Sequence, residues 1–288
     1  MSVTAGTVFQ GTRTPLTVWF EAGWLMTVPK NGVSALTLSQ TLPVGSYQTA
    51  WTMLAKYRAA MSSADKEKLS GVVEVDEWVH GGVAKGGTSL TGKNLVMAAV
   101  ERRPGGFGRA RLGVVANRAA WELRKFVRAK VEPGSLVVTD GLSAYRGALA
   151  GYSHEALNES APGAAEPHVL LPGVHRVFSL CERWLLGTHQ GGVKRGHLAE
   201  YLDEFGFRWN RRNSRHRGIV FYRLLQHAVG GRPVTYKDLV RVGAPKPVAP
   251  APPGSRVLPG TLEAAGGGRP WRRDGWGQPA AWPAAENM

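Results

Sequence analysis

The chain of 288 residues contains one cysteine, Cys181, and no apolar run long enough to span a membrane. A single cysteine excludes a disulfide framework and a zinc site built from several cysteines, and it favours a reducing compartment. The first residues lack the charged segment and apolar core of a signal peptide. We therefore expect a cytoplasmic protein that does not contact a membrane.

Acidic residues are also scarce. The sequence has 21 Asp and Glu against 36 Lys and Arg, which gives a formal net charge of +15. Such an excess favours a polyanionic partner, of which nucleic acid is the commonest. The alternative is a composition rich in arginine that serves no such partner. The length suggests about two domains, and a hydrophobic content of 43% is enough for a core.

Residues 1–66 have a helical pattern and no strand pattern. Two apolar helical segments, 32–42 ("GVSALTLSQTL") and 46–61 ("SYQTAWTMLAKYRAAM"), are separated by "PVG". Two short helices divided by a Pro/Gly turn predict a helix-turn-helix. The alternative is a helical bundle that does not contact DNA.

The second of these helices carries the predicted reading residues. Ser46 is the expected N-cap, because serine accepts a hydrogen bond from a free amide of the first turn. Tyr47, Gln48 and Thr49 follow it. Since the start of a recognition helix enters the major groove, we expect Gln48 and Thr49 to contact DNA.

Residues 67–230 have an α/β pattern. The expected strands are 72–79, 94–101, 109–115, a short apolar run ending at 140, and 152–156; the expected helices are 117–130, 142–149, 174–186, 195–211 and 216–229. Three antiparallel strands followed by alternating helix and strand predict a ribonuclease H-like fold, a mixed sheet flanked by helices.

Residues 231–288 form a tail that becomes rich in proline and glycine. Nine of the 18 prolines of the chain lie in 243–288. A segment of this composition cannot bury a core, and we expect it to be disordered.

Two aspartates stand at the ends of strand-like runs, Asp76 in "VEVDE" and Asp140 in "VVTDG". If the two strands are neighbours, their carboxylates converge and repel each other unless a hard cation such as Mg²⁺ or Mn²⁺ binds between them. Two such ions activate a water or a 3′-hydroxyl and stabilise the leaving oxygen of a phosphodiester. The alternative for Asp140 is a turn-capping role before Gly141.

Seven segments carry a family resemblance and occur in order over residues 5–230. They are "GTRTPLTVWFEAGWLM", "GVSALTLSQTL", "SYQTAW", "VEVDEWVHGG", "VVTDG", "VHRVFSLCERWLLGTHQGGVKRGHLAEYLDEFGFRWNRR" and "RGIVFYRLLQHAV". In these segments the chain resembles a bacterial insertion-sequence transposase of the DDE type. This group joins a zinc ribbon and a helix-turn-helix to a ribonuclease H-like catalytic domain.

The resemblance implies metal-dependent cleavage at the ends of a mobile element and transfer of the freed strands into target DNA. It implies double-stranded DNA as partner, a homo-oligomer in the DNA complex and a nucleoid-associated protein. The catalytic and metal-binding positions correspond to Asp76, Asp140 and His175, the last being at a position that varies among Glu, Asn and His in the group. Glu204 is a rival third carboxylate, but its apolar helical surroundings favour a structural role.

The sequence departs from the group at two features. A lysine usually follows the third catalytic position by seven residues, where this chain has Glu182. The zinc ribbon needs paired cysteines, which the sequence lacks. These departures favour an alternative function, a catalytically inactive DNA-binding protein derived from a transposase.

Several basic residues are expected to contact DNA phosphates, since phosphate contacts position a protein on the duplex. Solvated basic surface or a simple turn is the alternative for each. The expected residues are Arg183, Lys194, Arg208, Arg211 and Arg212.

Overall fold

A computed structural model describes residues 2–62, 64, 67–81, 93–157 and 166–242. The disorder predicted for residues 243–288 falls outside the described residues. None of the helices in the described ranges is long and apolar enough to cross a membrane.

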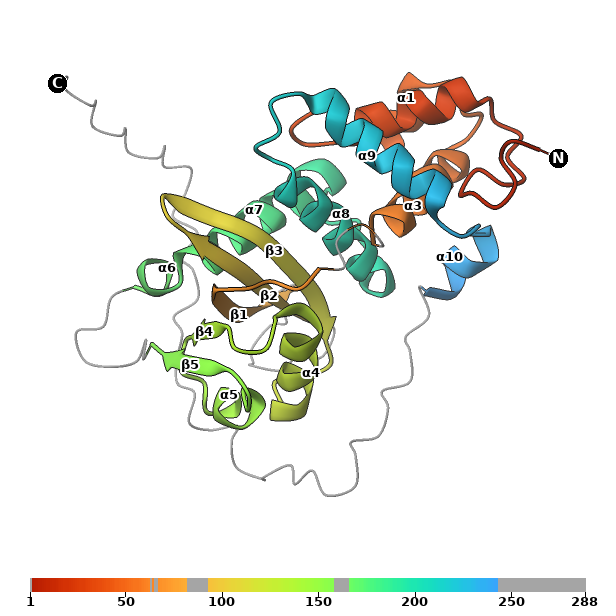
Figure 1. Cartoon of the computed structure of the whole chain (residues 1–288). Coiled ribbons are helices and arrows are strands. Elements are labelled where there is room, and N and C mark those ends of the chain that lie inside the picture. Colours follow the sequence, from red (N-terminus) through yellow and green to blue (C-terminus); the bar gives the residue numbers. More distant parts are fainter. Residues whose placement is uncertain (1, 63, 65–66, 82–92, 158–165, 243–288) are drawn as a thin grey trace, which may run out of the picture. The chain divides into compact units, whose positions relative to one another are not determined.

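A five-stranded mixed sheet forms the centre of the α/β part, in the order β3-β2-β1-β4-β5 (Figure 1). The first three strands are antiparallel neighbours, and β4 and β5 add in parallel beside β1. The strands are β1 (Val72–His80), β2 (Asn94–Arg103), β3 (Gly106–Val115), β4 (Leu136–Thr139) and β5 (Ser153–Ala156). This arrangement confirms the predicted α/β fold of the ribonuclease H-like type.

Helices cover both faces of the sheet, because alternate side chains of a strand point to opposite faces. Val96, Ala98 and Val100 of β2 belong to the core formed with two helices after β5, while Leu95 and Met97 belong to the core on the other face. The two helices on the first face are α7 (Pro172–His189) and α8 (Leu198–Asn210). The helices on the other face are α4 (Ala120–Lys130) and α5 (Ser143–Ala148).

The N-terminal helices build a third core. They are α1 (Leu16–Thr27), α2 (Ala35–Thr41) and α3 (Tyr47–Ser62). Ser46 Oγ accepts a hydrogen bond of 3.1 Å from the amide of Thr49, so Ser46 caps α3 as predicted. The helix α9 (Arg217–Gly230) contributes Val220 and Leu224 to this core and runs beside α1 (Figure 1). The N-terminal helices therefore share their core with a segment that lies beyond the sheet in sequence.

The described part of the chain also contains three short helices. They are α6 (Pro167–Leu170), the 3₁₀ helix η1 (Arg195–His197) and α10 (Tyr236–Val242). The first residues of the predicted tail therefore include a helix.

A buried ion pair connects α3 to α8. Arg58 Nε lies 2.8 Å from Glu204 Oε2, and the side chains are 2% and 0% exposed. The Arg58 guanidinium also stacks over the ring of Tyr201 at 3.8 Å from its centroid. These contacts support the structural role expected for Glu204, because a carboxylate that compensates a buried arginine is not free to bind a metal.

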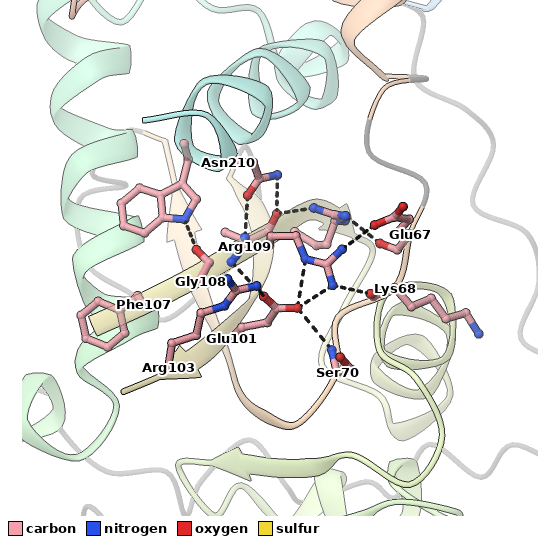
Figure 2. Close-up of polar contacts among 12 residues, drawn as sticks. Glu67, Lys68, Ser70, Glu101, Arg103, Phe107, Gly108, Arg109 and Asn210 are labelled. Carbon is pink, nitrogen blue, oxygen red and sulfur yellow. Dashed lines mark hydrogen bonds and ion pairs between the residues drawn. The ribbon is translucent and has the colours of Figure 1, made fainter. Parts of the chain in front are cut away.

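A second polar network ties the segment before β1 to the β2–β3 hairpin (Figure 2). Glu101 lies at its centre and accepts hydrogen bonds from Arg103 Nη2 at 2.9 Å and Arg109 Nη2 at 2.7 Å. Arg109 also donates to Glu67 and to the carbonyl of Lys68. Burial alone would raise the pKa of Glu101, but the hydrogen bonds from Arg109 and Arg103 lower it to about 2.

The same hairpin is joined to the end of α8 through Asn210. Its Oδ1 accepts a hydrogen bond from the Ala110 amide at 2.8 Å, and its Nδ2 donates to the Ala110 carbonyl at 3.2 Å. Because β3 is an edge strand, these bonds pair backbone groups that have no neighbouring strand. The side-chain amide therefore anchors α8 to the sheet edge.

The depressed pKa of Glu101 predicts an acid-dependent contribution to stability. The contribution is complete above the ordinary value of 4.5 and is lost as the pH falls toward about 2. Glu101→Gln should therefore lower the free energy of unfolding at pH 7 and have a much smaller effect near pH 2, as measured by urea denaturation. Glu155→Gln, on the exposed part of β5, serves as control. An effect of Glu101→Gln that stays constant over this range would contradict the assignment.

Candidate active site

The register of the sheet aligns Asp76 with Asp140. β1 and β4 are parallel neighbours, and their last pair is Glu74 with Val138. Continuing the same register by two residues brings Asp76 level with Asp140, which directly follows β4. The two aspartates are therefore level on adjacent strands, as expected for neighbouring strands, but Asp76 lies in the middle of β1 and not at its end as the sequence predicted.

His175 comes to the same place from α7. It lies in the first turn of the helix, and its Nε2 is 3.7 Å from Asp76 Oδ2. This nitrogen is buried and has no hydrogen-bond partner among the residues that the structure describes. The structure thus brings together Asp76 and His175, which are far apart in the sequence.

The three acids of "VEVDE" have different surroundings because they alternate along β1. Glu74 and Asp76 share the face that α7 covers, where Glu74 accepts hydrogen bonds from the amides of Gly173 and Val174. Glu77 points to the opposite face and accepts hydrogen bonds of 2.8 Å from Tyr145 Oη and from Arg118 Nε. Each of the three carboxylates therefore has its own partner or set of partners.

The charges near the site act on His175 and Glu77. Burial lowers the pKa of His175, while the negative charges of Glu74 and Asp140 oppose this shift. Burial raises the pKa of Glu77, and the negative charge of Asp140 raises it further. The lowered pKa favours the neutral imidazole near pH 7, and a neutral imidazole has the lone pair that a metal ion needs.

Asp140 also has the turn role that was its alternative. Its Oδ1 accepts a hydrogen bond of 3.0 Å from the amide of Leu142, and Gly141 between them has a φ of +84°. The left-handed backbone at Gly141 lets the chain turn sharply from β4 toward α5. The turn uses one carboxylate oxygen of Asp140, and no donor from the described residues reaches the other.

The residues present fit a divalent cation in part. Within the described ranges, no three His, Cys, Asp or Glu side chains form a ready cluster. Two donors, Asp76 Oδ2 and His175 Nε2, nevertheless converge, and the histidine nitrogen has no other partner. Asp140, level with Asp76 in the register of β1 and β4, is the third residue that could supply a ligand. The mixed donors suit Mn²⁺ better than Mg²⁺, which prefers oxygen.

Glu182 lies two turns after His175 on α7, so it lies on nearly the same side of the helix. It is exposed, and its negative charge acts on His80 at the end of β1. An acid therefore occupies the side of α7 on which a phosphate-binding cation was expected.

The predicted phosphate-binding residues fall into two groups. Arg183 and Lys194 are exposed. Arg208 is 9% exposed; its guanidinium donates to the carbonyls of Pro29 and Lys30 and lies 3.6 Å from Glu204 Oε1. A DNA phosphate would have to displace these contacts, so Arg208 is a packing residue in this structure.

The other two arginines are partly buried. Arg211 Nη1 donates to the carbonyl of Phe207 and its guanidinium lies over that ring. Arg212 donates to the carbonyls of Phe107 and Gly108 and stacks over Trp209. Arg212 therefore joins the end of α8 to the β3 edge, and it is less available to DNA than its sequence context predicted.

The start of α3 borders a groove of about 250 Å³. Gln48 is exposed, and Thr49 is half-buried. Gln48 Nε2 donates a hydrogen bond of 3.0 Å to Tyr236 Oη of α10. The lining residues are Thr12, Thr14, Trp19, Gln48, Thr49, Thr52, Met53, Lys56 and Tyr236. The two predicted reading residues therefore line one groove at the start of the helix.

Sequence reasoning missed Glu74, Arg102 and Gly173 around this site. Arg102 Nε lies 2.6 Å from Glu74 Oε1, and Gly173 is the helical residue closest to Glu74. The signal for Glu74 was present, since a carboxylate two residues before Asp76 must point to the same face of the strand. Nothing in the sequence indicated that its partner is the first turn of α7.

Comparison with known proteins agrees with this geometry. Residues 68–210 match the family model described as the ISXO2-like transposase domain. No curated protein and no solved structure gave a match. The matched range begins before β1 and ends with α8, so it contains Asp76, Asp140 and His175. With this domain and a ribonuclease H-like sheet, the chain belongs to the DDE-type insertion-sequence transposases.

Proposed function

We propose that the protein cleaves DNA at the ends of an insertion sequence and joins the freed ends to target DNA, with divalent metal ions. One observation carries the proposal: Asp76 Oδ2 and the unpartnered His175 Nε2 lie 3.7 Å apart beside the end of β4. A carboxylate and an imidazole this close together are two donors that a divalent metal ion accepts. The strand-transfer reaction makes this chain a polynucleotidyl transferase.

The chain's own residues have distinct roles in this proposal. Asp76, Asp140 and His175 would hold one or two Mg²⁺ or Mn²⁺ ions. The ions supply an activated water or 3′-hydroxyl and stabilise the leaving oxygen of the phosphodiester. The neutral imidazole of His175 would supply one nitrogen ligand, and the burial of that nitrogen would keep competing water away from it.

Recognition of double-stranded DNA is assigned to the start of α3 and to exposed cations. Gln48 and Thr49 would read bases at the element's ends, and Arg183 and Lys194 would contact phosphates. Arg211, which is partly exposed, would add a further phosphate contact. We also propose that two or more copies assemble on the DNA, because two element ends must be cut and joined together.

Glu182 supports a second candidate function, that of a DNA-binding protein without catalytic activity. An exposed acid on the His175 side of α7 repels phosphate, which favours a DNA-binding protein that has lost catalysis. A strand-transfer assay with oligonucleotides that carry the element's ends separates the two functions. Activity that appears only in Glu182→Lys would show that this acid has silenced the wild-type protein.

Asp76→Asn should abolish Mn²⁺-dependent cleavage of end-containing DNA and leave DNA binding intact or tighter, because one negative charge near phosphate is removed. Gel-based cleavage and filter binding measure the two effects on the same preparation. Glu155→Gln removes one exposed acid from β5 and should change neither. Cleavage by Asp76→Asn at the wild-type rate would refute the proposed site.

Gln48→Ala and Thr49→Ala should relax sequence preference more than they lower total affinity, since base contacts specify while phosphate contacts position. Footprinting on the element's end, compared with binding to a scrambled duplex, measures the difference. Gln40→Ala, at an exposed polar residue on α2, is the matched control. An unchanged footprint would show that α3 is a packing helix.

The two groups of cations should behave differently on substitution. Arg183→Ala with Lys194→Ala should weaken binding to all duplexes and reduce the salt slope by about two units, because about one counterion is released per phosphate contact. Arg208→Ala should instead lower the free energy of unfolding by about 3 kcal/mol, since it unpairs a buried network. Salt titrations and urea denaturation distinguish them. A stable Arg208→Ala protein with a reduced salt slope would reverse the assignment.

A further inference from the structure

Glu74 is a fully buried carboxylate on β1, two residues before Asp76. Both side chains point to the face covered by α7, while Val73 and Val75 point into the core with α4 and α5. The strand that carries Asp76 therefore places a second acid under the helix that carries His175.

Glu74 caps the start of α7, although it lies about a hundred residues earlier in the sequence. Its Oε2 accepts hydrogen bonds from the amides of Gly173 at 2.7 Å and Val174 at 3.0 Å. The first amides of a helix have no partner within the helix, and a negative charge at that end is favourable. Leu171, at the N-cap position, provides no side-chain hydrogen bond. Glu74 thus supplies the cap that the local sequence lacks.

Two further contacts hold this arrangement. Arg102 Nε lies 2.6 Å from Glu74 Oε1, and Arg102 Nη2 donates to the carbonyl of Leu170 just before α7. A Cβ at Gly173 would lie 2.8 Å from Glu74 Oε2 and 2.9 Å from Phe107 Cδ1. The close approach of α7 to Glu74 therefore requires glycine at position 173.

We infer that Glu74 is a positioning residue that sets the separation of His175 from Asp76. His175 directly follows Val174, whose amide Glu74 holds, and Asp76 lies on the same strand as Glu74. Because one strand carries both Asp76 and the anchor of α7, the helix cannot slide along β1 without breaking two charge-assisted hydrogen bonds. This inference rests on the proposed metal-binding role of Asp76 and His175.

The test measures Mn²⁺ affinity of the DNA-free full chain by electron paramagnetic resonance. Gly173→Ala disturbs the Glu74 contact without changing any charge. Gly187→Ala is the matched control on the same helix, because a Cβ there meets nothing within 4 Å. Gly173→Ala should weaken Mn²⁺ binding roughly 10–100-fold, as the loss of a ligand-orienting contact does, and Gly187→Ala should not.

A double variant separates positioning from general destabilisation. Gly173→Ala combined with His175→Ala should bind Mn²⁺ no more weakly than His175→Ala alone, because the ligand that Gly173 helps to place is already absent. Thermal unfolding confirms that each variant is folded. Glu74→Gln keeps an acceptor oxygen for the two amides and provides a second route if Gly173→Ala does not fold; it should weaken binding less than His175→Ala.

The outcomes are distinguishable. If His175→Ala binds Mn²⁺ as the wild type does, the proposed metal role of His175 fails and the positioning role fails with it. If His175→Ala weakens binding but Gly173→Ala does not, or if the double variant is weaker by the product of the two effects, Glu74 only stabilises the helix. A loss larger in Glu74→Gln than in His175→Ala would show that Glu74 acts through its charge alone, which also overturns positioning.

Discussion

The alternation of side chains along β1 is the constraint on which the site depends. Val73 and Val75 must enter one core, so Glu74 and Asp76 must face α7. Glu74 then accepts hydrogen bonds from the free amides at the start of that helix, and Asp76 lies beside His175. A one-residue shift in this strand would reverse both faces and separate the acids from α7.

The N-terminal helices depend on the sheet domain through buried charge. Arg58 of α3 and Glu204 of α8 form a pair that solvent does not reach, and Arg208 extends it to the carbonyls after α1. Such a pair stabilises little in total, but removing one partner leaves a buried charge unpaired, which is costly. Several arginines of this basic chain therefore hold the protein together, and only part of its charge is available to DNA.

Local patterns predicted much of the fold, because strand alternation and helical periodicity are written in short segments. The strands around Asp76 and Asp140 and the cap at Ser46 are examples. His175 came from family resemblance alone. The packing of α9 with the N-terminal helices and the burial of Arg208 were not predicted, since both depend on contacts between segments distant in sequence.

The central claim is that Asp76, Asp140 and His175 bind one catalytic metal centre. A crystal structure of the protein soaked in Mn²⁺, with an anomalous difference map at the manganese edge, tests it most directly. We expect a peak within coordination distance of Asp76 Oδ2 and His175 Nε2, with Asp140 turned toward it. A map with no peak between these residues, or with manganese bound only at exposed acids such as Glu182, would contradict the account.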